Sequence, residues 1–173
     1  TNASTESIDL QLKYQALTLY KYIPPLRNQD FIMASFDVRE GYNYVDMEKK
    51  QLVINSGKTE QKRSAKRIID LPENVFKVIQ ATKSRIGSDW LFPMRKTPTS
   101  PMNSSLFCKF MNSIFKKNIS SSVLRNIFRS KLHDENVSAD KLKMAADIMG
   151  HTSTTAFNTY TKYSKKLHPE LND

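Results

Sequence analysis

The sequence is poor in the residues on which several common kinds of site depend. Cys108 is its one cysteine, which excludes an internal disulfide framework and a Cys-rich zinc site. Four glycines in 173 residues form neither GxGxxG nor GxxxxGKS/T, so a Gly-rich phosphate loop is excluded as well. No apolar run approaches the roughly 20 residues that span a bilayer, and the opening Thr-Asn-Ala-Ser begins no signal peptide. We therefore expect an intracellular protein that is neither secreted nor attached to a membrane.

Acidic residues are also scarce, with 17 Asp and Glu against 27 Lys and Arg, a formal net charge of +10. Residues 58–67 hold five basic residues and one acidic residue, and residues 109–131 hold six basic residues and no acidic one. These net charges of +4 and +6 account for the whole excess, and the rest of the chain sums to zero. Charge concentrated in two segments favours a polyanionic partner, nucleic acid, over a protein that is merely kept soluble by its charge.

The hydrophobic spacing predicts an α+β fold in one domain. From Ile8 to Ile23 apolar residues recur every three or four positions, which is typical of a helix, and Pro24-Pro25 ends it. A further helical turn is expected over 31–34. Runs rich in β-branched and aromatic residues then predict three strands, over 42–46, 51–54 and 65–71. Further helices are expected over 73–83, 105–117, 121–135, 138–149 and 155–163. The prediction is a mainly helical domain with a small three-stranded antiparallel sheet in its N-terminal half.

Three polar residues in the helical half have a notable order and spacing. Arg125 flanks Leu124, Ile127 and Phe128, which we expect to form an inward stripe with Arg125 beside the core. His151 follows a glycine just past a predicted helix end, and Tyr160 comes nine residues later. Each alone has an ordinary explanation as a surface arginine, a helix cap or a packed aromatic ring. Together they favour a shared site.

The helical half resembles the catalytic domain of the tyrosine recombinase (phage integrase) family. Leu124-Arg125-Asn126-Ile127-Phe128 resembles the segment that holds the family's second arginine. Ile148-Met149-Gly150-His151-Thr152-Ser153 resembles its Leu-Gly-His-Ser motif, and Tyr160 falls where the family has its nucleophile.

The N-terminal half carries the resemblance further, so that it extends from about Ile8 to Tyr163. Leu26-Arg27 resembles the first-arginine motif, and Lys58 matches the lysine of the family's β-hairpin. Trp90-Leu91-Phe92-Pro93 resembles a structural segment found in many members. The Pro24-Pro25-Leu26-Arg27 form of the first motif is more similar to members from large DNA viruses and virophages than to bacterial ones.

The resemblance implies a role for each matched residue. Arg27 and Arg125 would hold the oxygens of a DNA phosphodiester, since a guanidinium binds two such oxygens and keeps its charge. Tyr160 would attack the phosphorus to give a 3′-phosphotyrosyl link, and Lys58 would protonate the departing 5′-hydroxyl. His151 would hydrogen-bond a nonbridging oxygen. A covalent intermediate of this kind needs no ATP, no metal and no other cofactor.

Two positions complicate the match. Ser122 stands three residues before Arg125, where the family usually has histidine, and serine can donate a hydrogen bond but cannot act as a base near neutral pH. We keep Ser122 as a candidate site residue. Tyr163 is a second possible nucleophile, although the spacing from His151 favours Tyr160.

The remaining basic residues in the two charged segments are candidates for contact with DNA. They are Lys62, Arg63, Lys66, Arg67, Lys116, Lys117 and Arg129. The first four of these are also alternatives to Lys58 as the hairpin lysine.

The domain organisation follows from the same resemblance. We expect residues 1–7 to be the remnant of a linker and residues 8–173 to be the catalytic domain, with the family's N-terminal core-binding domain absent from this chain. The expected partner is double-stranded DNA, on which family members assemble as tetramers, whereas this chain alone could be monomeric. Two other functions remain open: a non-catalytic DNA-binding domain, and a relaxing enzyme of the type IB topoisomerase kind.

Overall fold

The computed structural model describes residues 5–55, 66–135 and 137–150 of the chain. Its first helix, α1 (Thr5–Tyr22), forms because Leu12, Ala16 and Leu19 lie on one face, where all three are fully buried. The helix begins before the predicted position, so residues 5–7, which we expected to be linker, form its first turn. The Ser7 hydroxyl accepts a hydrogen bond from the Arg85 guanidinium at 2.6 Å.

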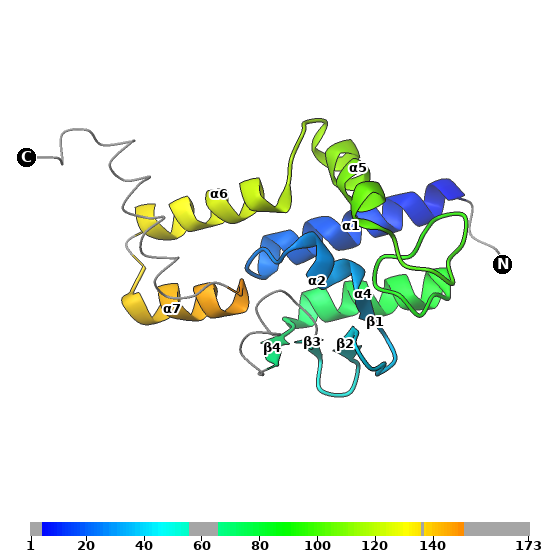
Figure 1. Ribbon diagram of the computed structural model, residues 1–173, viewed down its shortest axis with the longest axis horizontal. Helices are drawn as coiled ribbons and strands as arrows, with labels where there is room; N and C mark the ends of the chain where they lie inside the picture. Colours follow the sequence, from blue (N-terminus) through cyan, green and yellow to red (C-terminus); the bar gives the residue numbers. More distant parts are fainter. Residues whose placement is uncertain (1–4, 56–65, 136, 151–173) are drawn as a thin grey trace, which may run out of the picture.

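The sheet contains four strands in the order β1-β2-β3-β4 (Figure 1). The predicted strands are present as β2 (Asn43–Asp46), β3 (Gln51–Ile54) and β4 (Arg67–Asp70), and both pairings among them are antiparallel. Val45 pairs with Leu52, and Leu52 in turn with Ile69, which places apolar residues on one face.

The prediction of three antiparallel strands was wrong in one respect, because a fourth strand makes the sheet mixed. Strand β1 (Ala34–Ser35) pairs in parallel with β2, where a helical turn was expected to continue. The preceding helix, α2 (Asn28–Ile32), ends first. A strand of two fully buried residues carries no alternating pattern, and tertiary pairing alone defines it.

The core lies between the sheet and four helices. Helix α4 (Glu73–Ile86) packs along α1, and α5 (Ser104–Phe115) packs against α2. The fully buried Phe92 ring lies at the centre, with ring centroids of Phe31, Phe107 and Phe110 at 6.0, 5.0 and 6.1 Å. The segment around Trp90 and Phe92 is thus part of the core.

Helices α6 (Ser121–Asp134) and α7 (Ala139–Ile148) lie at the end of the molecule farthest from the start of α1 (Figure 1). The inward stripe predicted for α6 was wrong at Ile127, which is 58% exposed, whereas Arg125 and Arg129 are each only 7% exposed. The cause is that α6 faces the end of α7, whose backbone oxygens accept hydrogen bonds. Backbone carbonyls need hydrogen-bond donors, so the side of α6 that faces them carries arginine and not an apolar side chain.

No helix among the described residues is long and apolar enough to cross a bilayer.

Candidate functional site

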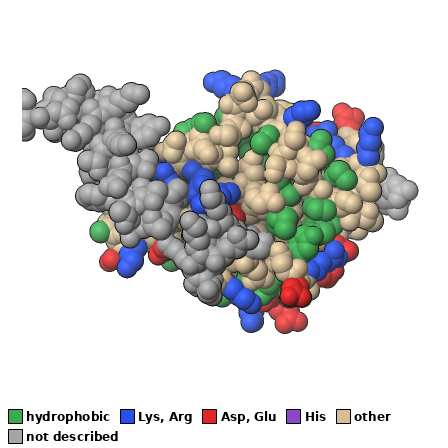
Figure 2. Space-filling model, viewed as in Figure 1, with side chains coloured by type: hydrophobic (Ala, Val, Ile, Leu, Met, Phe, Trp, Pro, Cys, Tyr) green, Lys and Arg blue, Asp and Glu red, His purple; other side chains and the backbone are tan. Residues whose placement is uncertain are grey.

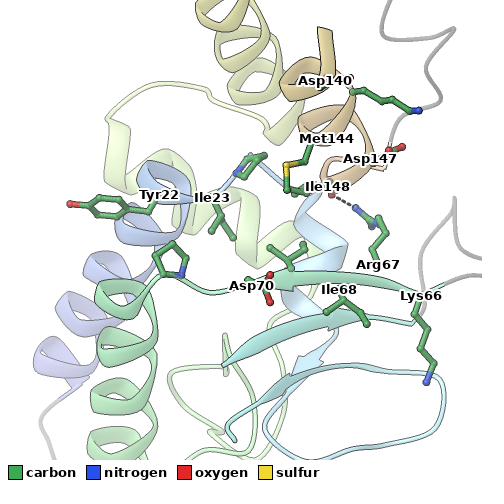
Figure 3. Close-up of a pocket in the computed structure, with 14 residues that line it drawn as sticks. Tyr22, Ile23, Lys66, Arg67, Ile68, Asp70, Asp140, Met144, Asp147 and Ile148 are labelled. Carbon is green, nitrogen blue, oxygen red and sulfur yellow. Dashed lines mark hydrogen bonds between the residues drawn. The ribbon is translucent and has the colours of Figure 1, made fainter. Parts of the chain in front are cut away.

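Three arginines from separate segments converge on the C-terminal end of α7. The Nη2 atom of Arg27, which precedes α2, donates to the Gly150 carbonyl at 3.1 Å. The Nη1 atom of Arg67, at the start of β4, donates to the Ile148 carbonyl at 2.6 Å (Figure 3). The Nη2 atom of Arg125, on α6, donates to the carbonyl between these two, that of Met149, at 2.8 Å.

The end of α7 attracts these donors for two physical reasons. The last carbonyls of a helix have no partner within the helix, and they form the negative end of its dipole. The helix stops because Gly150 adopts a left-handed conformation, with φ of +69°. A β-carbon added at Gly150 would lie 3.0 Å from Cζ and Nη1 of Arg67. Glycine is therefore required here both for its backbone conformation and for the close approach of Arg67.

Asp30 is a site residue that the sequence reasoning missed. Its side chain is 1% exposed, and Oδ2 accepts from the backbone N–H of Arg27 and from Nη2 of Arg67, each at 3.1 Å. The available signal was its position, an acidic residue in the first turn of a helix that begins directly after Arg27. Asp30 thereby links two of the converging arginines.

Arg129 completes the group that we call the arginine cluster, made of Arg27, Arg67, Arg125 and Arg129. The pKa of Arg125 is lowered to about 10, first by burial and then by the positive charges of Arg27, Arg129 and Arg67, while Asp30 opposes this shift. Positive charges around Arg125 therefore exceed the negative charge that faces it. An enclosed cationic group of this kind is an anion-binding site in chemical character.

Figure 2 shows Lys and Arg side chains gathered near the middle of the viewed face, in the area where Figure 1 places the start of α2 and the end of α7.

A neutral polar group lies beside the cluster. Burial and the charge of Asp30 raise the pKa of Tyr20 well above its usual value, so Tyr20 stays protonated. Its ring packs edge-on against Phe31, with centroids 5.5 Å apart. The Nδ2 atom of Asn28 donates to the sulfur of Cys108 at 3.3 Å. Cys108 is half-buried.

The other predicted site residues fall into two groups. Ser122, Lys66, Lys116 and Lys117 are exposed, and Ser122 does not share the buried side of α6 with Arg125. The second group lies outside the described residues, together with the predicted helix over 155–163: Lys58, Lys62, Arg63, His151, Tyr160 and Tyr163.

Among residues 5–55, 66–135 and 137–150, no three His, Cys, Asp or Glu side chains are grouped so that they could hold a metal ion.

Comparison with known proteins gives both a family and a fold. The sequence model of the phage integrase family matches residues 37–166. The crystal structure of XerA recombinase is similar with a TM-score of 0.62 at 15% identity, over 94% of this chain and 57% of that one. A structure of the Tn1549 transposon integrase in complex with a circular intermediate DNA is similar with a TM-score of 0.60 at 17% identity, over 91% of this chain and 60% of that one.

This chain thus spans about three fifths of the length of these two structures, which share its fold. No curated protein matches it in sequence. The family model covers most of the chain, including the segments that supply Arg67, Arg125 and the end of α7. On that match, the chain belongs to the phage integrase family.

Proposed function

We propose that the protein is a tyrosine recombinase that cleaves and rejoins double-stranded DNA through a covalent 3′-phosphotyrosyl intermediate. The observation that carries the proposal is the arginine cluster. Arg27 and Arg125 come from segments 98 residues apart, and both donate to adjacent carbonyls at the end of α7. A phosphodiester is the anion that the family match favours for this site.

The two arginines suit the chemistry of phosphate transfer. A guanidinium has five N–H donors in a planar fork, so it can bond a protein carbonyl and phosphate oxygens together. With a pKa of about 10, Arg125 remains charged at neutral pH. The transition state carries more negative charge than the bound diester, and preorganised cations lower its energy relative to the ground state.

The reaction then proceeds in two balanced steps. Tyr160 attacks phosphorus as the phenolate and forms a P–O bond, the P–O5′ bond breaks, and Lys58 gives a proton to the departing 5′-oxygen. A 5′-hydroxyl from another strand then attacks the phosphotyrosine and returns its proton to Lys58, and the P–O bond to Tyr160 breaks to release the phenolate. The intermediate keeps the energy of the bond, so neither ATP nor a metal is required.

Two further residues assist the site in this proposal. His151 follows Gly150 in the sequence, and the Gly150 carbonyl accepts a hydrogen bond from Arg27. His151 hydrogen-bonds a nonbridging phosphate oxygen. Ser122 occupies the sequence position of the family's usual histidine and donates a hydrogen bond to DNA.

DNA is the proposed partner, held by exposed lysines outside the cluster as well. The Tn1549 integrase, whose fold this chain shares, is in complex with DNA. We propose in addition that the protein assembles as a tetramer on two duplexes and that it integrates a viral genome.

A nicked suicide duplex tests the covalent step directly. Cleavage releases a short strand that diffuses away, so the protein–DNA adduct accumulates and is seen on a denaturing gel, with EDTA present. The wild-type chain should form the adduct and Tyr160→Phe should not. Tyr163→Phe is the matched control and should form it. An adduct that survives in Tyr160→Phe contradicts the assignment of the nucleophile.

The same experiment separates the alternatives. DNA binding by the wild-type chain without any adduct would favour a non-catalytic DNA-binding domain. An adduct together with relaxation of supercoiled DNA that has no target site would favour an enzyme of the type IB topoisomerase kind.

A further inference from the structure

Arg67 joins the two protein segments that hold the arginine cluster. Its side chain is 9% exposed, and its two terminal nitrogens bond to different partners. Nη2 pairs with Oδ2 of Asp30 at 3.1 Å, and Nη1 donates to the Ile148 carbonyl at 2.6 Å. A buried, charge-assisted contact of this kind is less screened by salt than a surface ion pair.

On one side, the pairing fixes the start of α2. The same Oδ2 atom of Asp30 that faces Arg67 also accepts from the backbone N–H of Arg27. The backbone carbonyl of Asp30 accepts from Nδ2 of Asn43 at 2.9 Å, and Asn43 is fully buried in β2. Hydrogen bonds therefore fix both the side chain and the backbone of Asp30, and the bond from Arg67 connects Asp30 to β4. The Arg27 backbone takes its position from this arrangement.

On the other side, Arg67 fixes the end of α7. Its bond to Ile148 lies one residue from the carbonyl that accepts from Arg125 and two residues from the carbonyl that accepts from Arg27. The guanidinium also lies so close to Gly150 that a β-carbon there would meet it at 3.0 Å. His151 is the next residue in the chain.

We propose that Arg67 is a positioning residue of the recombinase site, not a DNA contact. It holds the Arg27 backbone and the end of α7, from Ile148 to Gly150, in one fixed geometry, and so it acts on catalysis through those groups. The inference rests on the proposed function. Displacement of a reacting group by about 1 Å is enough to slow a reaction about 100-fold, so a residue that only positions the reacting groups can still control the rate.

The chemistry of the contact explains why arginine is needed. Lysine at this position keeps the positive charge, but a single ammonium group lacks the planar fork that bonds Asp30 and Ile148 in two directions at once. The proposal therefore predicts that Arg67→Lys has an adduct rate and a protection against hydrogen exchange between those of the wild-type chain and those of Arg67→Gln.

The first arm of the test measures positioning without any use of activity. Hydrogen exchange followed by mass spectrometry on the 173-residue chain reports on peptides that cover residues 28–33 and 145–150. In Arg67→Gln both should exchange about 10-fold faster, because a buried charged pair has been broken. The matched control is Arg39→Gln, which removes an exposed arginine paired with Asp89 at 3.1 Å, outside the arginine cluster. The control should leave both peptides unchanged, and unchanged exchange in Arg67→Gln overturns the proposal.

The second arm measures the adduct rate on the suicide duplex against DNA affinity. In Arg67→Gln the rate should fall about 10- to 100-fold while the dissociation constant changes by less than about 3-fold. If Arg67 contacted DNA, its loss would instead weaken affinity and reduce the salt dependence of binding, so a loss of affinity as large as the loss of rate overturns the proposal.

A double-mutant cycle connects the two sides of the contact. Asp30→Asn and Arg67→Gln should each slow the adduct, and the two together should be no slower than the worse single variant, because both remove one coupled contact. Losses that multiply would contradict the link through Asp30.

The arms keep this inference separate from the proposed function. If the wild-type chain forms no adduct, the proposed function fails, while the exchange arm still decides whether Arg67 positions α2 and α7. If Arg67→Gln fails to fold, Arg67→Lys takes its place in both arms, and wild-type exchange and rate in Arg67→Lys would overturn the proposal.

Discussion

Gly150 is the residue at which backbone conformation and site geometry meet. Its φ of +69° belongs to the left-handed region, and its missing β-carbon leaves room for the Arg67 guanidinium. Gly87 offers a natural comparison, because it ends α4 with φ of +66° but has nothing within 4 Å of the place where a β-carbon would be. Both glycines therefore adopt a left-handed conformation, but only Gly150 has a side chain, that of Arg67, packed where a β-carbon would be.

Replacing each glycine with alanine separates these effects. Gly87→Ala should lower the free energy of unfolding by about 1–2 kcal/mol, the cost of a left-handed L-residue. Gly150→Ala should lower the free energy of unfolding by more than Gly87→Ala does. It should also slow adduct formation on the suicide duplex, because Arg67 must shift. Urea titration and the adduct rate measure the two outcomes. Equal losses of stability, with an unchanged adduct rate, would show that Arg67 does not depend on the space at Gly150.

At the scale of elements, α6 shows how a site can override hydrophobic patterning. Arg125 and Arg129 lie one turn apart on the buried side, although like charges at this spacing destabilise an isolated helix. The acceptors at the end of α7 and the carboxylate of Asp30 compensate for Arg125. Ile127 consequently faces outward.

This orientation predicts opposite effects for two neighbouring apolar residues on α6. Ile127→Ala should change the free energy of unfolding by no more than about 0.5 kcal/mol, as exposed substitutions usually do. Leu124 is partly buried and packs against the core, so Leu124→Ala should cost about 1–2 kcal/mol through lost apolar burial. Thermal or urea unfolding compares them. A larger loss of stability in Ile127→Ala than in Leu124→Ala would indicate that Ile127 faces the core, as hydrophobic spacing alone predicts.

Most elements could be predicted because their signals are local. Prolines and glycines mark the ends of α1 and α7, and apolar spacing of 3.6 or 2 residues marks the helices and β2 to β4. Strand β1 could not be predicted, because two residues show no period and their pairing with β2 is tertiary.

The site was predictable to a different extent. Arg27 and Arg125 could be named from short motifs, but Asp30 could not be assigned a role from sequence, since its partner Arg67 lies 37 residues away. The orientation of α6 likewise depends on acceptors that another helix supplies.

At the scale of the whole molecule, the charge excess divides into an enclosed part and an exposed part. The arginine cluster is largely buried and binds protein carbonyls and Asp30. Lys66, Lys116 and Lys117 are exposed instead. Enclosed guanidiniums suit recognition of one phosphate in a fixed geometry, whereas exposed lysines suit contacts that release counterions along a DNA backbone.

The exposed part should determine how DNA binding depends on salt. Affinity measured by fluorescence anisotropy should fall with salt concentration, and the slope of log K against log salt should shrink by about 1 for each phosphate contact removed. Lys116→Ala and Lys117→Ala should each reduce the slope and weaken binding to all sequences alike. Lys49→Ala removes another exposed lysine, at the turn between β2 and β3 and outside both basic segments, and serves as the control. If all three variants reduce the slope equally, the +10 charge acts as a general field, and the separation into an enclosed cluster and a DNA-tracking surface does not hold.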